Sequence, residues 1–575
     1  MTMKHIWKLF VLLLCVATAA SILVACSCSD TPEAPTTTST SSSANTTDTP
    51  TTAPESTTKT EETTTAVETS GKGPTSTTAT VTLPKPIDSC ETHTPSAGGT
   101  YCSVCYSVLK NNEKEYLDMV YFACDDETLT KAYQIALQDY NSNVHLYKDG
   151  ILTQQEPCIM AGAGYNTPWT RDTAINVYNA VALLERDVAL NTLYSVLKKT
   201  GSNYQIDGQY WDAVIWSIGA FRYYTVTGDT EFLKIAQNAL SNSLKRFERE
   251  EFDSSDNLFR GAAVYGDGIA AYPDRYSEGV GSSGIEGWVG AHPDEKVNIG
   301  AGLPMKALST NCVYYQAYVV LAQMNDILGI ETETPLKKAE ALKTAINKVF
   351  WNEEKGTYDY LAYECDYQEA LGVAFVLLFG VADERQAALV LENTYVTEQG
   401  IACVWPAFDR YLNLDGYGRH SGTVWPHAQG FWASACATYG YTYGFEFELF
   451  VLAEKAVANG QFHEIYHPDT GEVYGGLQGS GKNDISLWGS VEHQTWSATG
   501  YLSLVYYHIL GADIQEGTIS FTPYLPTGVN EATVSGFKVG NTTFEITITR
   551  GGDGVSTFSY DTTQEDTVRV HMSVK

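Results

Sequence analysis

The sequence is short of positive charge. Its 575 residues include 36 Lys and Arg against 68 Asp and Glu, a formal net charge of −32. A surface this acidic repels phosphate backbones, which argues against nucleic acid as a partner. No sequence repeat of 30–45 residues is visible, which argues against a helical solenoid. Apolar residues still make up 43% of the chain, enough for a large core, so disorder cannot describe the whole molecule.

The N-terminus has the pattern of a secretory signal. Lys4 and Lys8 precede an uncharged stretch that ends in Leu-Val-Ala-Cys26. A basic start, a short apolar stretch and small residues before a cleavage site distinguish a signal from a spanning helix. The last four residues resemble the bacterial lipobox, and an ordinary signal peptide with a free cysteine nearby is the alternative. We expect residues 1–25 to be removed and Cys26 to be lipidated, anchoring an extracellular protein to the bacterial cell membrane.

A Ser/Thr-rich segment follows the anchor. In residues 31–80, 28 of 50 are Ser or Thr. This composition cannot bury enough surface to offset the entropy of ordering, so residues 26–86 are expected to be a disordered tether.

The twelve cysteines are too dispersed for a disulfide framework in a chain of this length. Six of them are interpreted as buried small apolar residues. These are Cys124, Cys158, Cys312, Cys365, Cys403 and Cys436. Four residues in segment 87–110 have the spacing of a tetrahedral site: Cys90-x2-His93 and Cys102-x2-Cys105. This spacing predicts a structural zinc, and one disulfide with an incidental Cys and His is the alternative. No cofactor is expected for catalysis.

Apolar residues recur with helical spacing from about residue 127 onward, which predicts twelve helices. The expected helices cover 127–143, 172–185, 187–199, 211–227, 229–250, 308–328, 334–349, 367–380, 383–394, 422–439, 444–458 and 492–510. Joins after the even-numbered helices are short, as at Thr227-Gly228-Asp229, whereas joins after the odd-numbered helices are long. Short joins produce antiparallel helical hairpins. Six such hairpins predict a mainly α fold, an (α/α)6 toroid over residues 111–515 with its long loops on one face.

The spacing of apolar residues changes after the last expected helix. Residues 516–575 contain stretches such as Phe544–Thr549 in which β-branched residues alternate with others, and Gly-containing turns separate them. This pattern predicts a small C-terminal all-β domain.

The long loops carry the candidate site residues. Trp169, Arg171 and Asp172 together offer an aromatic stacking face, a bidentate donor and an acceptor for the hydroxyls of a sugar. Asp267 lies between two glycines, which suggests an unusual backbone turn, and Glu464 precedes the last helix. The further substrate-binding candidates are Trp211, Asp212, Tyr272, Trp425 and Trp496.

Three of these loops resemble the six-hairpin glycosidases. The resemblance rests on Trp-Thr-Arg-Asp at 169–172, Gly-Thr-Val-Trp-Pro at 422–426 and Glu-x-Tyr-x-Pro-x-Thr-Gly at 464–471. It covers about residues 125–512 and is to the inverting α-glucosidases of glycoside hydrolase family 63, trehalase, glucoamylase and the amylo-α-1,6-glucosidases. Family 63 and trehalase relatives carry the catalytic acid in a Ser-Gly-x-Asp-x-Ser turn, whereas this chain has Tyr-Gly-Asp267-Gly.

The resemblance implies an inverting, exo-acting α-glycosidase on oligosaccharides, α-glucosidase-like, with Asp267 as general acid and Glu464 as general base. Arg171 and Asp172 would hold the hydroxyls of the terminal sugar. Inversion requires two carboxyl groups about 6.5–9.5 Å apart, and loops on opposite sides of a funnel can supply such a gap. An apolar pocket would favour the protonated acid. The rival acids are Asp274, Glu278 and Glu286, and the rival bases are Glu472 and Glu492.

Two other functions remain open from the sequence. A glycoside phosphorylase on the same fold would need a phosphate pocket in place of the base. A non-catalytic sugar-binding lipoprotein would share the aromatic residues and the anchor but would not need opposed carboxylates. Sugar identity, linkage and oligomeric state are not indicated by the residues.

Overall fold

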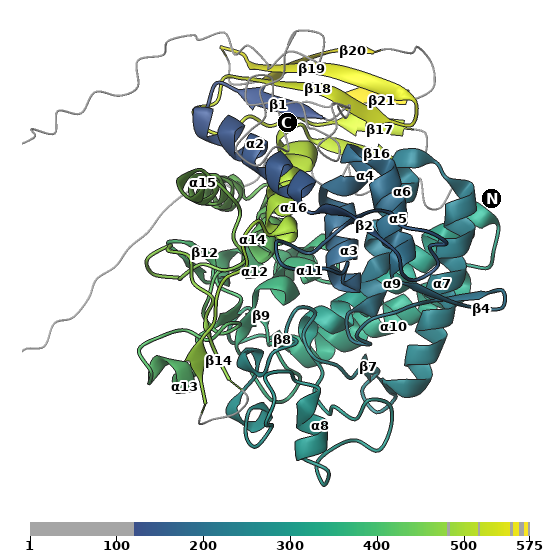
Figure 1. Cartoon of the computed structure of the whole chain (residues 1–575), viewed down its shortest axis with the longest axis vertical. Helices are drawn as coiled ribbons and strands as arrows, with labels where there is room; N and C mark the ends of the chain where they lie inside the picture. The colour runs from purple at the N-terminus through teal and green to yellow at the C-terminus, as the bar shows by residue number, and fades with distance from the viewer. Residues whose placement is uncertain (1–119, 480–483, 516–517, 553–555, 563–568, 573–575) are drawn as a thin grey trace, which may run out of the picture. The chain divides into compact units, whose positions relative to one another are not determined.

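The structure is a computed structural model that describes residues 120–479, 484–515, 518–552, 556–562 and 569–572. The signal segment, Cys26, the tether and the Cys/His segment with Cys90, His93, Cys102 and Cys105 lie outside the described residues. Helices make up about 46% of the chain, so the fold is mainly α as expected (Figure 1).

Six helices pack against one another in cyclic order. These are α3 (Thr170–Asn176), α6 (Trp216–Thr227), α9 (Leu308–Leu328), α11 (Ala370–Leu378), α14 (Pro426–Thr438) and α16 (Thr495–Leu504). Each contacts the next along the chain, and α16 also contacts α3. Helices α11 and α16 are apolar on nearly every face and almost wholly buried. Burial on all sides is what an inner helix requires.

Six further helices alternate with these along the chain and pack outside them. They are α2 (Glu127–Ser142), α5 (Arg186–Ser195), α7 (Thr230–Glu250), α10 (Glu333–Phe350), α12 (Glu384–Asn393) and α15 (Thr442–Asn459). Helix α7 buries one stripe at helical spacing, from Phe232 through Leu240 to Phe247, and leaves its other faces polar. A single apolar stripe is typical of a helix with one solvent-facing side.

Each of the twelve expected helices has a counterpart in the structure. The joins explain why the sequence pattern worked. Gly228 ends α6 with a φ of 73°, and the Asp229 side chain accepts a hydrogen bond from the Phe232 backbone N–H at the start of α7. A left-handed glycine followed by an Asp cap reverses the chain within a few residues.

Several helix boundaries differ from the expectation. Residues 197–199 are strand rather than helix, because β4 (Leu197–Thr200) and β5 (Asn203–Ile206) form a hairpin around Gly201. Residues 422–425 are not helical, because Pro426 occupies the first turn of α14 and disfavours helical backbone in the residue before it. Two of the expected helices contain a π turn. The expected helix 172–185 consists of α3, the π turn η3 (Val177–Val181) and α4 (Ala182–Leu184), and the expected helix 492–510 consists of α16 and the π turn η7 (Val505–Ile509).

The C-terminal strands form two sheets with an unexpected member. A four-stranded sheet has the order β1-β18-β19-β20, and a three-stranded sheet has the order β16-β17-β21. The strands are β1 (Tyr121–Cys124), β16 (Ala512–Gln515), β17 (Thr518–Phe521), β18 (Glu531–Val539), β19 (Thr542–Arg550), β20 (Ser556–Thr562) and β21 (Arg569–Met572). Strand β1 pairs antiparallel with β18 and β16 contacts α6, so these sheets draw on residues before 516.

Short elements lie in the long loops. They include the helices α8 (Gly287–Ala291) and α13 (Asp409–Leu412) and the 3-10 turns η4 (Ala213–Ile215), η5 (Ile269–Ala271) and η6 (Asp274–Tyr276). The two-stranded ribbons are β2 (Val144–Tyr147) with β3 (Glu156–Ile159), β6 (Phe252–Asp253) with β7 (Leu258–Phe259), β8 (Trp351–Asn352) with β9 (Thr357–Tyr358), β10 (Gln368–Glu369) with β13 (Val404–Trp405), β11 (Val396–Thr397) with β12 (Gly400–Ile401), and β14 (Leu477–Gln478) with β15 (Ser486–Leu487).

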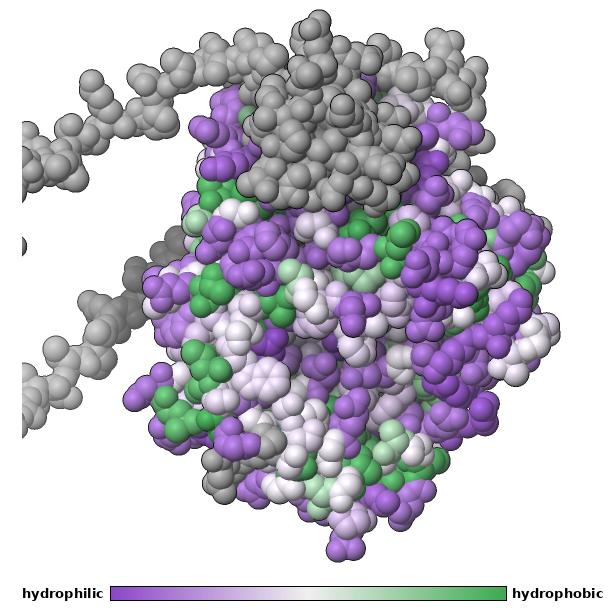
Figure 2. Space-filling view, viewed as in Figure 1, coloured by the Kyte–Doolittle hydropathy of each residue, from purple (hydrophilic) through white to green (hydrophobic). Residues whose placement is uncertain are grey.

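The surface in Figure 2 is largely hydrophilic, with apolar residues in small groups. Within the ranges that the structure describes, none of the helices combines the length and the apolar composition needed to cross a membrane. The six mid-chain cysteines are free and buried, which confirms their interpretation as small core residues.

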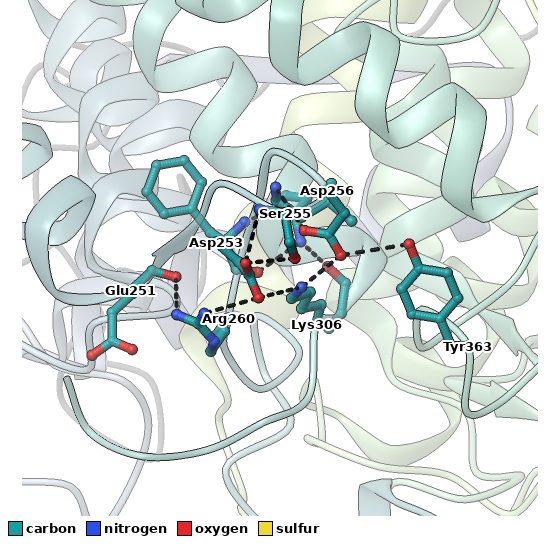
Figure 3. A network of polar contacts seen from close by, with 11 residues as sticks. Glu251, Asp253, Ser255, Asp256, Arg260, Lys306 and Tyr363 are labelled. Carbon is teal, nitrogen blue, oxygen red and sulfur yellow. Dashed lines mark hydrogen bonds and ion pairs between the residues drawn. The ribbon is translucent and has the colours of Figure 1, made fainter. Parts of the chain in front are cut away.

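An ionic network joins the two ends of the longest loop (Figure 3). Lys306 Nζ donates to Asp253 Oδ2 (2.9 Å) and to Asp256 Oδ2 (2.6 Å), and Arg260 Nη2 lies 2.8 Å from Asp253 Oδ2. Residues 260 and 306 are the two ends of the segment that carries Asp267, and Gly261 N–H donates to the Met305 carbonyl beside them (2.8 Å). The network therefore fixes the base of this loop.

We predict that Lys306→Met lowers the free energy of unfolding by about 3 kcal/mol, because Asp256 loses its cation and Asp253 keeps only Arg260. Lys355→Met is the matched control, since it removes an exposed ion pair with Asp366 and should cost less than about 1 kcal/mol. Urea unfolding followed by circular dichroism measures both. Equal losses in the two variants would contradict a structural role for the network.

Candidate active site

A cavity of about 570 Å³ opens among the loops that precede the inner helices. This volume falls within the range of small-molecule sites. Of the residues expected from the sequence, Trp169, Arg171, Asp172, Asp212, Asp267, Trp425, Glu464 and Trp496 line it. Residues far apart in the chain thus meet at one site, as expected for loops on one face.

Arg171 joins three of the loops. It lies in the first turn of α3, and its Nη1 donates to Asp212 Oδ2 (2.9 Å) and to the Val264 carbonyl (3.0 Å). Its Nη2 lies 3.9 Å from Asp267 Oδ2, and its Nε lies 4.0 Å from Asp172 Oδ2. One guanidinium therefore holds three carboxylates that would otherwise repel one another.

Burial dominates the electrostatics of two of these acids. It raises the pKa of Asp172 to about 7 and that of Asp212 to about 7, although Arg171 acts in the opposite direction on both. The nearby Asp267 carboxylate adds to the rise in each case. Near neutral pH these two carboxyls can therefore both donate and accept hydrogen bonds, which suits recognition of sugar hydroxyls.

Asp267 projects into the cavity from a tightly packed turn. A Cβ on Gly266 would meet the Tyr272 hydroxyl at 2.6 Å, and a Cβ on Gly268 would meet Gln478 Oε1 at 2.3 Å. Gly268 has a φ of −92°, so close packing explains this glycine, and the expectation of an unusual backbone conformation is wrong there. The Asp267 side chain is 47% exposed, so the desolvated carboxyls of the site are Asp172, Asp212 and Glu464.

Glu464 is buried on the opposing loop and paired with Arg419. Arg419 Nη2 donates to Glu464 Oε2, and its Nη1 donates to the carbonyls of Gly475 (2.9 Å) and Gly489 (3.0 Å). Burial raises the pKa of Glu464, and Arg419 opposes this effect. Val424 and Tyr466 exchange backbone hydrogen bonds (3.1 and 2.9 Å), which joins the loop of Glu464 to the loop before α14.

Aromatic rings form much of the remaining wall. Trp425 stacks on His420 with ring centroids 4.7 Å apart, and Trp496 stacks on His427 at 4.1 Å. Trp169 is 53% exposed at the N-cap of α3, where its ring is available for stacking. Flat apolar faces beside polar acceptors are typical of sugar-binding sites.

Two expected residues do not line the cavity. Trp211 is 1% exposed and Tyr272 is 0% exposed, and both belong to a separate apolar cluster beneath the loops. Tyr272 accepts a hydrogen bond from the Ala263 N–H and donates to the Gly266 carbonyl, so it supports the turn of Asp267. The expectation that these two rings touch the substrate is therefore corrected.

The structure distinguishes the rival carboxylates by whether they line the cavity. Glu286 lines the cavity and accepts from Gln209 Nε2 (3.1 Å), whereas Asp274 pairs with Arg410 (2.8 Å) outside the lining. Glu278, Glu472 and Glu492 are not among the lining residues. Glu286 is thus the remaining alternative to Asp267.

Sequence reasoning missed several lining residues. Arg419 and His420 directly precede the Gly-Thr-Val-Trp motif, but no spacing rule links Arg419 to Glu464. Gln478 and Gln494 line the cavity, and their buried Oε1 atoms lack a hydrogen-bond partner. These acceptors, together with His420 Nδ1, can receive hydrogen bonds from a ligand.

Over the described part of the chain, no group of three or more His, Cys, Asp or Glu residues is arranged to hold a metal ion. The zinc expected at Cys90, His93, Cys102 and Cys105 stays a prediction, because those residues lie outside the description.

Comparison with known proteins identifies the superfamily. Residues 214–497 match the family model of the mannosylglycerate hydrolase MGH1-like glycoside hydrolase domain. This match, together with the solved structures of the same fold, points to the six-hairpin glycosidase superfamily. The resemblance expected from the three loops is therefore confirmed, and the chain carries a glycoside hydrolase domain. No curated protein sequence matches it.

Solved structures share this fold at low identity. A family 78 rhamnosidase of a Bacillus species aligns with a TM-score of 0.52 and 14% identity, covering 79% of this chain and 43% of that one. A sialidase aligns with a TM-score of 0.54 and 14% identity, over 77% and 40%. The family 63 mannosylglycerate hydrolase of Thermus thermophilus, in complex with glucose, gives 0.50 and 14%, over 64% and 98%. This chain thus spans less than half the length of the first two.

We predict that Asp212→Asn changes how stability depends on pH. The folded-state pKa of Asp212, about 7, lies above the ordinary value, so its contribution is complete below about pH 4 and is lost as pH rises through 7. The difference in unfolding free energy, wild type minus variant, should fall by roughly 1–4 kcal/mol between pH 4 and 8.

Thermal and urea unfolding across this pH range measure the difference. Asp207→Asn serves as the control, because Asp207 is an exposed partner of Lys198. A difference for Asp212→Asn that stays constant or grows with pH would contradict the burial argument.

Proposed function

We propose that the protein is an inverting, exo-acting α-glycosidase, α-glucosidase-like, that hydrolyses oligosaccharides. The observation that carries the proposal is that the carboxyl groups of Asp267 and Glu464 line one cavity from loops that precede α9 and α16. Inversion requires the two carboxyl groups to be about 6.5–9.5 Å apart, a gap that separate loops around one cavity can supply. The cyclic packing of the inner helices supports an (α/α)6 toroid, in which such loops share a face.

Asp267 is proposed as the general acid. Its half-exposed carboxyl lines the cavity, where it can reach the glycosidic oxygen of a bound sugar. The proton passes to the glycosidic oxygen as the bond from that oxygen to the anomeric carbon breaks. The leaving alcohol departs neutral, and Asp267 is left as a carboxylate.

Glu464 is proposed as the general base. Arg419 opposes the effect of burial and so favours the ionised carboxylate that this role needs. The carboxylate takes a proton from water, whose oxygen attacks the anomeric carbon on the face opposite the leaving group. Proton exchange with solvent then returns both residues to their starting states.

The hydroxyls of the terminal sugar are proposed to bind the Arg171 cluster. Asp172 and Asp212 supply donors and acceptors near neutral pH, and Trp425 and Trp496 supply apolar faces. Charge-assisted and bidentate hydrogen bonds give this subsite its geometric selectivity. Trp169, exposed at the cavity, would stack against the remainder of the oligosaccharide.

The location follows from the N-terminus. We propose that the enzyme is anchored by a lipid at Cys26 on the bacterial cell membrane and that the Ser/Thr-rich tether holds the catalytic domain away from it. Catalysis needs no cofactor in this scheme. A phosphorylase would need a phosphate pocket in place of the general base, and the presence of Glu464 in this cavity argues for hydrolysis instead.

We predict that Asp267→Asn and Glu464→Gln each lower kcat by at least about 100-fold, because each removes one proton-transfer step. Both variants should still bind the substrate, because Arg171, Asp172 and Asp212 are unchanged. Steady-state kinetics on an α-glucosyl oligosaccharide, with calorimetry for binding, measure the two effects.

Glu286→Gln is the matched control, since Glu286 lines the same cavity but has no role in the scheme. It should retain kcat within about threefold of the wild type, well short of the loss expected from removing a general acid. If Glu286→Gln abolishes turnover while Asp267→Asn does not, the acid is Glu286. Full activity in both Asp267→Asn and Glu464→Gln would overturn the proposed function.

A further inference from the structure

A second cavity, of about 460 Å³, lies at the other ends of the inner helices. Helix α3 begins at the candidate active site and continues into η3, which contributes Tyr178 and Asn179 to the second cavity. Helix α16 also begins at the candidate active site and continues into η7, which contributes Tyr507 and His508 to the second cavity. Residues of β16 complete the lining, so this cavity is distinct from the catalytic one.

Arg222 of α6 is the charged centre of this cavity. Its guanidinium carbon lies 4.8 Å from the ring centroid of Tyr178 and 4.2 Å from that of Tyr507. Among the residues that the structure describes, Arg222 makes no ion pair with a carboxylate; Asp513, the nearest acid of the lining, is exposed on β16 and interacts only weakly with it. One hydrogen bond joins the Arg222 guanidinium to the Tyr178 side chain, and its remaining N–H donors can bind a planar oxyanion.

Two independent features mark the same place. The π-helical turns η3 and η7, the two found among the described helices, both line this cavity. Such turns are rare and are frequently found at functional sites. The Tyr507 hydroxyl, on η7, is also buried without a hydrogen-bond partner. A buried hydroxyl atom without a hydrogen-bond partner, beside a guanidinium that lines the cavity, indicates a polar ligand.

We propose that the second cavity binds a small sugar acid, with its carboxylate on Arg222 and its ring against the aromatic wall. The volume exceeds what a bare ion needs, and the rings of Phe431 and Tyr524 offer apolar faces. The hydroxyls of Ser434 and Thr438 can bond those of the sugar. A bidentate carboxylate contact would supply most of the selectivity over neutral sugars.

The test uses the full chain and D-glucuronate as the probe, with D-glucose and inorganic phosphate for comparison. Isothermal calorimetry should show glucuronate binding at least about tenfold tighter than either. Arg222→Gln should weaken glucuronate binding by at least about tenfold, because it removes the charge-assisted pair. Thr438→Trp, a substitution at an exposed lining position, should block entry without disturbing the core.

Arg249→Gln is the matched control, because it removes an exposed Arg on α7, and it should bind glucuronate like the wild type. Glucuronate binding that is unchanged in both Arg222→Gln and Thr438→Trp, as expected if the probe occupies only the catalytic cavity, would overturn the proposal. Equal affinity for glucose or phosphate, or no glucuronate binding at all, would also overturn it.

Discussion

The contact of Arg171 with three carboxylates is the interaction on which the site depends. Asp172 comes from the first turn of α3, and Asp212 and Asp267 come from the loops before α6 and α9; in a chain of net charge −32 they would repel one another without a shared cation. Nη1 also donates to the Val264 carbonyl, so the same side chain fixes the backbone near the proposed acid. Specificity for a sugar and placement of the acid thus rest on one guanidinium.

The helices that pack in cyclic order and the loops that precede them have different roles. Helices α11 and α16 bury nearly all their side chains and so set fixed positions for the residues at their ends, while the loops supply charged groups that a core could not hold. The loop of Asp267 is long, but the ion pair of Lys306 with Asp253 fixes its base, and the Tyr272 hydroxyl accepts a hydrogen bond from the backbone within the loop. Glu464 is held from the other side by Arg419, whose own donors are satisfied by two backbone carbonyls. Both proposed catalytic groups are therefore positioned by residues that need not touch the substrate.

The helices could be predicted from the sequence, because the signals for them lie in consecutive residues. Helices such as α7 follow from the spacing of Phe232, Leu240 and Phe247 and from the cap at Asp229, which are properties of consecutive residues. The pairing of β1 with β18 could not be predicted, because it joins segments about four hundred residues apart. The burial of Trp211 and the ion pair of Arg419 depend in the same way on neighbours from distant loops. Composition identifies an aromatic ring, but only tertiary packing decides whether it faces a ligand or the core.

The measurement that tests the central claim most directly is the stereochemistry of the first product. Proton NMR, recorded within minutes of adding enzyme to an α-linked glucosyl oligosaccharide, resolves the two anomers of the released sugar before they interconvert. A water activated by Glu464 opposite the leaving group predicts that the β-anomer appears first. Initial release of the α-anomer would show retention and would contradict a scheme in which the two carboxyl groups act as acid and base on opposite faces of the sugar.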